Sequence, residues 1–220
     1  MLENIFGDWS KYIDTKELNI ITSQLSILYK IVGREVLPKK QEVFKAFKFC
    51  QCKDCKIVFL SQDPYPQKDK ATGIAFGNKE GEKEYSPSLN IIREALDPEL
   101  RYKFDYTLES WCKQGILMLN SALTIESGKI GSHTWLWRDF IAKFLKNFSE
   151  SNNGIIFVLW GQQAKTFLPY INIKYNYVFF EKHPAYYART NSKLSNTIFK
   201  KVSELSKSLN GEEIKWIDFE

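Results

Sequence analysis

One stretch of the sequence indicates an open α/β sheet: Lys56-Ile57-Val58-Phe59-Leu60-Ser61-Gln62-Asp63-Pro64-Tyr65-Pro66. Its first five residues form a short apolar run with β-branched members, which is typical of a buried strand in a parallel sheet. The next six residues therefore form a loop at the carboxyl end of that strand, where open α/β sheets bind ligands. Because two prolines restrict its backbone, this loop is expected to hold Gln62 and Asp63 in place for chemistry.

Three further apolar runs, 115–119, 154–159 and 177–180, have the length of buried strands. Predicted helices precede, separate or follow the runs, and several of them have apolar residues at helical spacing. They are Ile21 to Val32, Val43 to Phe47, Leu89 to Leu96, Leu108 to Gln114, Trp137 to Phe148, Gln162 to Leu168 and Leu194 to Leu209. Strands that alternate with helices predict a parallel sheet covered on both faces. We therefore expect an α/β fold, a three-layer α/β/α sandwich with a four-stranded, mainly parallel sheet.

The composition indicates one globular domain. The chain has 220 residues, of which 44% are hydrophobic and 15% aromatic, enough for one sizeable core without a linker. We expect a single domain over residues 1–220. The first residues lack a basic region followed by an apolar stretch, and no window is apolar enough to span a membrane. The expectation is a cytoplasmic protein without membrane association.

Charge and cysteine content carry less information. The net charge of +5 fits a polyanionic partner, but many proteins that bind no nucleic acid share it. Cys50, Cys52 and Cys55 are spaced like metal ligands, whereas a structural zinc or iron–sulfur centre needs about four. The remaining Cys112 is distant and lies in a predicted helix. We expect reduced thiols, no metal and no cofactor.

Polar residues follow three of the predicted strands. Gln62 and Asp63 follow the first, Asn120 the second and His183 the fourth. Taken singly, Asn120 could be a turn former and His183 a hydrogen-bonded loop histidine. Because the carboxyl ends of parallel strands meet at one edge of a sheet, we expect the four side chains to converge on one site.

A second candidate site is the start of the helix at Leu89. Ser86, Pro87 and Ser88 precede it, and hydroxyls with a proline are typical of a helix N-terminus capped by a side chain. The ordinary interpretation is a helix cap, but free N–H groups at such a terminus also bind phosphate. The segments 67–85 and 121–134 are predicted loops, and loops of this length are usually functional.

Several motifs together resemble the family-one uracil-DNA glycosylases. Gln62-Asp63-Pro64-Tyr65, followed by Gly73-Ile74-Ala75-Phe76, resembles the family's water-activating loop, and residues 115–125 resemble its strand that ends in a uracil-pairing asparagine. His183-Pro184 begins a segment similar to the one that penetrates DNA. The similar connecting segments are Ser132-His133, Trp137-Arg138-Asp139-Phe140 and residues 159–164. The resemblance extends from about Trp9 to Leu205.

The resemblance implies a metal-independent DNA N-glycosylase, a hydrolase of base-excision repair that removes flipped-out uracil and leaves an abasic site. Asp63 then stabilises positive charge on the sugar and orients water, while His183, as a neutral imidazole, stabilises the departing uracil anion. Phe76 stacks on the base, Asn120 pairs with it, and Tyr65 excludes the 5-methyl group of thymine. Gln62 belongs to the same substrate-binding set.

The resemblance also implies uracil-containing DNA, single- or double-stranded, as the partner. Ser86, Pro87 and Ser88 are the expected phosphate contacts. Counting from His183 places Tyr187 where the family has its leucine wedge, with Tyr186 beside it and Arg189 within reach of phosphate. The alternative for both tyrosine rings is packing onto the domain. We expect a monomer. The sequence does not indicate whether a protein inhibitor or a replication partner binds it.

Some residues depart from the family pattern. Ser61 replaces a usual glycine, Pro66 replaces a usual histidine, and alanine and tyrosine replace serine and leucine after His183-Pro184. A glycine–serine pair expected before the fourth strand is also missing. These departures leave two alternatives: a glycosylase-fold subunit that binds DNA or a polymerase, and a glycosylase for another damaged base. A Rossmann-type enzyme is disfavoured because no G-x-G-x-x-G follows a strand.

Overall fold

The structure, a computed structural model, describes residues 3–31 and 33–217. Its centre is a four-stranded sheet in the order β3-β2-β5-β6. The strands are β2 (Ile57–Ser61), β3 (Ile116–Asn120), β5 (Ile156–Trp160) and β6 (Tyr177–Glu181). Every neighbouring pair is parallel. Each strand begins and ends within two residues of its prediction, so the α/β fold class is confirmed.

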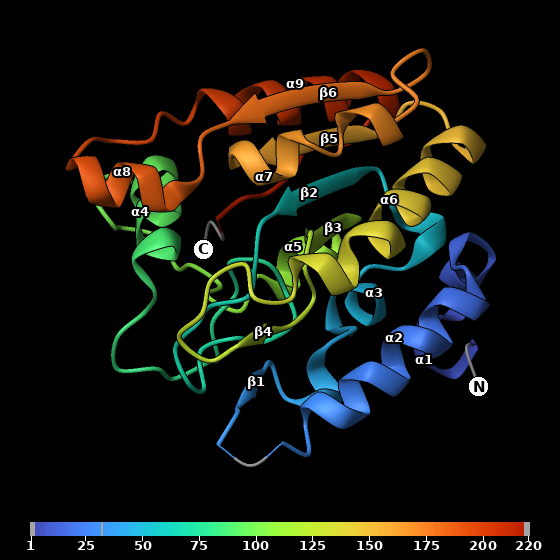
Figure 1. Cartoon of the computed structure of the whole chain (residues 1–220). Coiled ribbons are helices and arrows are strands. Elements are labelled where there is room, and N and C mark those ends of the chain that lie inside the picture. The colour runs from blue at the N-terminus through green and yellow to red at the C-terminus, as the bar shows by residue number, and fades with distance from the viewer. Residues whose placement is uncertain (1–2, 32, 218–220) are drawn as a thin grey trace.

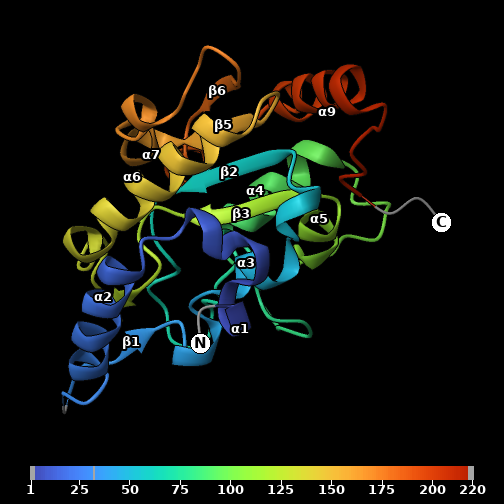
Figure 2. The same cartoon turned by 90° about the vertical axis from the view of Figure 1, so that its right-hand side faces the viewer.

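Helices cover both faces of the sheet, and Figure 2 shows α6 and α9 on opposite sides of it. The α-helices are α1 (Glu3–Phe6), α2 (Thr15–Leu28), α3 (Lys45–Phe49), α4 (Pro87–Leu96), α5 (Glu109–Lys113), α6 (Thr134–Ser151), α7 (Gly161–Lys165), α8 (Pro184–Thr190) and α9 (Thr197–Asn210). Short 3-10 helices cover Gly7–Tyr12, Lys40–Glu42, Cys52–Asp54 and Leu168–Tyr170. The predicted three-layer sandwich is therefore confirmed. None of the helices in the described residues is long and apolar enough to cross a membrane.

The register of the sheet brings the strand ends together. Ser61 lies opposite Asn120, and Leu60 pairs with Leu159. Strands β2, β3 and β5 are buried along their whole length, which explains why they read as continuous apolar runs. Figure 1 shows β2 and β6 pointing toward the side of the molecule that holds α4 and α8. The segments that leave the sheet there form the site.

Two segments differ from their predictions. The predicted loop 121–134 contains β4 (Ile125–Glu126), which pairs antiparallel with β1 (Val36–Leu37). Two-residue strands are too short to show a period of two in the sequence. The segment after His183, for which no regular element is predicted, forms α8 with Pro184 in its first turn. Val32, which the sequence places in the first predicted helix, lies outside the described residues, and α2 ends at Leu28.

The C-terminal tail is part of the core, which the sequence does not reveal. Trp216 is 9% exposed and stacks on Phe59 of β2, with ring centroids 5.9 Å apart. Its carbonyl oxygen accepts the Trp111 indole N–H at 3.0 Å, and its own indole N–H donates to Ser203 Oγ at 3.0 Å. The tail thereby joins β2, α5 and α9 on one face of the sheet.

All four cysteines are buried free thiols. Cys112 lies on α5 and is less isolated than its sequence position suggests. Burial and, to a smaller extent, the Cys50 thiol raise the pKa of Cys112. Within residues 3–31 and 33–217, no three His, Cys, Asp or Glu side chains are grouped so that they could hold a metal ion.

Candidate active site

The ends of the strands surround a pocket of about 400 Å³. The loop after β2, the end of β3 and the segment after β6 all contribute to it. Its lining includes these predicted site residues: Gln62, Asp63, Tyr65, Phe76, Asn120 and His183, together with Pro87, Ser88 and Arg189. The structure thus brings most of the predicted residues into one cavity. Ser86, Tyr186 and Tyr187 are not among its lining residues.

The two carboxylate oxygens of Asp63 have different surroundings. Oδ2 accepts a hydrogen bond from the Gly131 backbone N–H at 2.9 Å. Oδ1 is buried and has no hydrogen-bond partner in the described part of the protein. Burial raises the pKa of Asp63 above its ordinary value, although the hydrogen bond from Gly131 opposes that rise. One oxygen is therefore fixed, and the other is free to interact with a reacting group.

The loop that holds Asp63 is fixed by the chain that follows β3. The Gln62 carbonyl oxygen accepts hydrogen bonds from the Ala122 N–H at 3.0 Å and from the Ser121 hydroxyl at 2.9 Å. The Ser121 N–H donates to the Ser61 carbonyl at 2.9 Å. These bonds continue the contact of β2 with β3 beyond the last ladder pair, so they position Asp63 relative to Asn120.

Both ring nitrogens of His183 have partners that define where its proton lies. Nδ1 accepts a hydrogen bond from the Ala185 N–H at 3.2 Å, which requires an unprotonated Nδ1, so the neutral ring carries its proton on Nε2. Nε2 lies 3.3 Å from Ser61 Oγ. Burial and, second, the charge of Arg189 lower the pKa of His183 to about 4. At neutral pH the imidazole is an uncharged hydrogen-bond donor.

Gly161 makes room for His183. It follows β5 directly and has a φ of +85°. A Cβ atom at this position would lie 3.0 Å from the Cβ of His183. Both the left-handed backbone and the close approach exclude a side chain. The glycine in the motif 159–164 therefore allows the His183 segment to lie against the end of the sheet.

We expect His183 to titrate with a midpoint near pH 4, well below the ordinary value of 6.5. Because the folded pKa is depressed, the folded protein binds fewer protons than the unfolded chain between these values, and stability falls as the pH drops through this window. Nitrogen NMR of the imidazoles during an acid titration measures the midpoint and the tautomer, and His183→Gln identifies its signals among the two histidines. A midpoint near 6.5, or a proton on Nδ1, would contradict this account.

The closed end of the pocket has a flat apolar wall and an amide. Phe76 is 5% exposed, and its ring centroid lies 5.4 Å from that of His183. Its φ of +64° is unusual for a side chain of this size, and the Tyr65 hydroxyl donates to its carbonyl oxygen at 2.9 Å. Asn120 Oδ1 is buried without a protein partner. This end can take a planar ring that pairs with an amide.

The segment before α4 differs from the predicted side-chain cap. Ser86 precedes the helix, but its hydroxyl does not cap it. Instead, Asn78 Nδ2 donates to Ser86 Oγ at 2.9 Å, and Asn78 Oδ1 accepts the Ser86 N–H at 2.7 Å. Because the Asn78 side chain binds both the hydroxyl and the backbone N–H of Ser86, this serine serves the fold rather than a phosphate. The sequence gives no signal for Asn78, which is one of many polar residues in a long loop.

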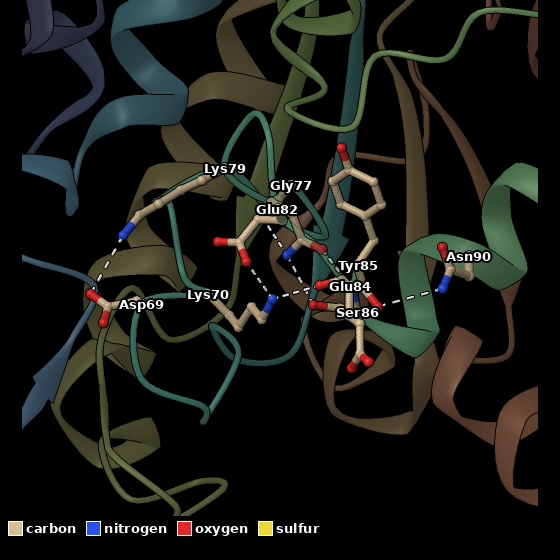
Figure 3. A network of polar contacts seen from close by, with 10 residues as sticks. Asp69, Lys70, Gly77, Lys79, Glu82, Glu84, Tyr85, Ser86 and Asn90 are labelled. Atoms are coloured by element: carbon tan, nitrogen blue, oxygen red, sulfur yellow. Dashed lines mark hydrogen bonds and ion pairs between the residues drawn. The ribbon is translucent and has the colours of Figure 1, made fainter.

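Polar contacts also restrain the long segment 67–85 (Figure 3). Lys70 Nζ lies 2.5 Å from a Glu82 carboxylate oxygen and donates to the Glu84 carbonyl at 2.6 Å. Asp69 and Lys79 form a second ion pair at 3.6 Å. These contacts join the two halves of the loop, so the wall around Phe76 and the start of α4 are held together.

The two tyrosines of α8 have different environments. The Tyr187 hydroxyl donates to the Glu181 carboxylate at 2.8 Å, and its ring is half-buried. Tyr186 is 37% exposed and lies under the Lys182 ammonium group, 4.2 Å from its ring centroid. Arg189 is exposed at the pocket. In the free protein, therefore, Tyr187 packs on the domain and Tyr186 is the ring that faces solvent.

Known proteins share this sequence pattern and this architecture. Residues 47–206 match the sequence profile of the uracil DNA glycosylase superfamily. A uracil-DNA glycosylase of Campylobacter jejuni is 35% identical over 184 residues, which are 82% of this chain and 79% of that protein. This chain belongs to the uracil DNA glycosylase superfamily.

Other members of the superfamily extend the comparison. A uracil-DNA glycosylase of Vibrio parahaemolyticus is 29% identical over 94% of this chain and 90% of that protein. A mimivirus UNG variant, solved in complex with UGI, has a TM-score of 0.83 and 25% identity over 96% of this chain and 87% of that chain. The UNG of Nitratifractor salsuginis, at 20% identity, shares the fold with a TM-score of 0.60 over 97% and 92% of the two chains. The family resemblance read from the motifs is confirmed.

Proposed function

We propose that this protein is a uracil-DNA glycosylase that hydrolyses the N-glycosidic bond of a deoxyuridine flipped out of DNA. The observation that carries the proposal is the pocket, in which a carboxylate with one free oxygen, an imidazole donor and an unpartnered amide surround one aromatic wall. Membership of the superfamily supports it. We also propose that one domain, residues 1–220, carries this activity.

The chemistry needs stabilisation of opposite charges on the two fragments. As the bond breaks, positive charge develops on the deoxyribose and negative charge on the uracil. Asp63 is the group for the sugar: its carboxylate opposes the positive charge, and its free Oδ1 can orient the attacking water. His183 is the group for the base, because its Nε2–H can donate to the uracil O2 oxygen. A second carboxylate is unnecessary because uracil is a better leaving group than an alcohol.

Base selection follows from the closed end of the pocket. Phe76 supplies the stacking face, and the Asn120 amide supplies an acceptor for N3–H and a donor for O4 of uracil. Tyr65 fills the space that the 5-methyl group of thymine needs, and its bond to the Phe76 carbonyl keeps it there. Gln62, which lines the pocket next to Asp63 in the chain, completes the substrate-binding set. The polar groups of cytosine do not match the donor and acceptor that the Asn120 amide presents to uracil, so cytosine is rejected.

DNA is the proposed partner, and the mouth of the pocket supplies the contacts. Pro87 and Ser88 at the start of α4, and Arg189 on α8, lie on the pocket lining. We assign them to the DNA backbone on either side of the flipped nucleotide. Ser86 acts indirectly, because its side chain is bonded to Asn78 and holds the start of α4. We propose a monomer as the working form.

Tyr187→Ala is expected to weaken cleavage of uracil in duplex DNA more than in single strands, because only the duplex has a stack to open. A ring inserted into the gap would first leave the Glu181 carboxylate. Tyr187→Phe, which keeps the ring without that bond, should therefore cleave duplex DNA at least as fast as the wild type. Single-turnover rates on both substrates decide the matter, with Tyr175→Ala, at an exposed tyrosine outside the pocket lining, as the matched control. An equal loss on the two substrates would remove Tyr187 from the wedge role.

The direct test is release of uracil. The protein is incubated with an oligonucleotide that holds one uracil, in the presence of a chelator, and the strand is then treated with alkali. Strand scission at the uracil position, with free uracil in solution, is the expected result. Tight binding of the DNA without scission would instead support a DNA-binding subunit that keeps the glycosylase fold.

A further inference from the structure

Ile130 is an exposed apolar residue at the mouth of the pocket. With 68% of its surface accessible, it is the most exposed large hydrophobic residue in the described part of the chain. It also lines the pocket. Single exposed apolar residues are ordinary on protein surfaces. One that borders a pocket of convergent polar groups is instead a candidate for ligand contact.

The loop that carries Ile130 is fixed on both sides of it. Two residues earlier, the Gly128 N–H donates to the Pro66 carbonyl at 2.9 Å. One residue later, the Gly131 N–H donates to Asp63 Oδ2 at 2.9 Å. Both partners belong to the loop after β2, which carries the reactive carboxylate. Ile130 is therefore presented at the mouth by a braced turn, and its side chain has no core contact to satisfy.

The position of Ile130 in the chain also indicates which end of the pocket this residue borders. Asn120 and Phe76 form the base end of the pocket. Asp63 belongs to the sugar end in the proposed chemistry, and the residue next to Ile130 bonds directly to Asp63. Ile130 consequently lies at the sugar end, where a flipped nucleotide would place the apolar C–H face of its deoxyribose.

We propose that Ile130 is a substrate-contacting residue that packs against the deoxyribose of the flipped nucleotide. This inference rests on the proposed function and adds a residue outside the sequence motifs. Apolar contact between the branched aliphatic side chain of Ile130 and the sugar removes both surfaces from water, which favours the bound nucleotide. The contact is to the sugar, so it is independent of the base and of the strand opposite.

The test uses Ile130→Ala, with Ile27→Ala as the matched control. Ile27 lies on α2, is 63% exposed and is outside the pocket lining. An oligonucleotide with a tetrahydrofuran abasic analogue presents the sugar without a base. Ile130→Ala should bind it about tenfold more weakly than wild type, on the scale of a few lost methyl contacts. The kcat/KM for cleavage of uracil-containing DNA should fall by a similar factor for single-stranded and duplex substrates. Ile130→Leu should restore most of both losses.

Free uracil supplies the remaining control, because it occupies only the base end. Its inhibition constant should be the same in wild type and Ile130→Ala. If the wild type cleaves uracil-containing DNA, and Ile130→Ala binds the abasic analogue and cleaves uracil-containing DNA as the wild type does, this inference alone is overturned. A loss confined to duplex DNA, or weaker inhibition by uracil, would also overturn it. A wild type that releases no uracil would overturn the proposed function and this inference together.

Discussion

Asp63→Asn should fold like the wild type and lose about 10² to 10⁴-fold of the single-turnover rate of uracil release. The substitution preserves the shape of the side chain, and the amide oxygen can still accept the hydrogen bond from Gly131. What it removes is the negative charge beside the sugar and the free carboxylate oxygen that orients water. Binding of DNA should change little, because the loss concerns the transition state.

Asp69→Asn is the control for that substitution. Asp69 is a carboxylate of the neighbouring loop that pairs with Lys79 at 3.6 Å and is 58% exposed on its side chain. Its loss should leave the rate near that of wild type, since exposed ion pairs contribute little. Thermal unfolding of both variants checks the fold. A rate for Asp63→Asn close to that of wild type would remove Asp63 from the reaction.

Asn120→Asp should reduce uracil excision by on the order of 10²-fold, the cost of a mispaired buried polar group, and allow cytosine excision. Asn120 is 5% exposed, and burial favours the protonated form of a carboxyl at this position. A protonated carboxyl presents a donor to cytosine N3 and an acceptor to its amino group. Rates on oligonucleotides with uracil or cytosine measure the switch. If the folded variant cleaves no cytosine above background, the pairing role is wrong.

Tyr65→Ala provides the complementary variant, because it changes the shape of the pocket and not its pairing. It should admit thymine and leave cytosine excluded. Since the Tyr65 hydroxyl also bonds the Phe76 carbonyl, Tyr65→Phe separates the ring from that bond and should keep thymine out. Thymine cleavage by Asn120→Asp, or cytosine cleavage by Tyr65→Ala, would contradict the separate roles given to the two residues.

The sequence predicted the features that depend on local pattern. Strands β2, β3 and β5 were predictable because buried parallel strands are continuous apolar runs. The edge strand β6 was predictable from its run of aromatic and β-branched residues, although Tyr177 and Phe180 are exposed. Asp63, Asn120 and His183 were predictable because each stands at or just beyond a strand end. Their convergence then follows from parallel topology. The family motifs indicated the roles of Asp63, Asn120 and His183, which hydrophobic periodicity does not reveal.

The features that escaped prediction are contacts between loops far apart in the chain. Gly131 bonds Asp63 across 68 positions, and Ser61 contacts His183 across 122. Such contacts depend on which segments lie side by side after folding. The local sequence around a loop glycine or serine does not indicate which distant residue it will contact. The unpredicted helix α8 has small and aromatic residues without an apolar period, so its helical form depends on Pro184 and the surrounding fold.

Competition among bases in one reaction tests the base selection assigned to Phe76, Asn120 and Tyr65. Oligonucleotides that differ only in one position, which holds uracil, thymine, cytosine or hypoxanthine, are mixed in equal amounts with the protein and a chelator. Mass spectrometry then quantifies the free bases and the abasic strands. We expect that uracil alone is released, in equal number to the abasic sites formed in its strand. Release of hypoxanthine or another base at a comparable rate, or of no base while DNA is bound, would contradict this expectation.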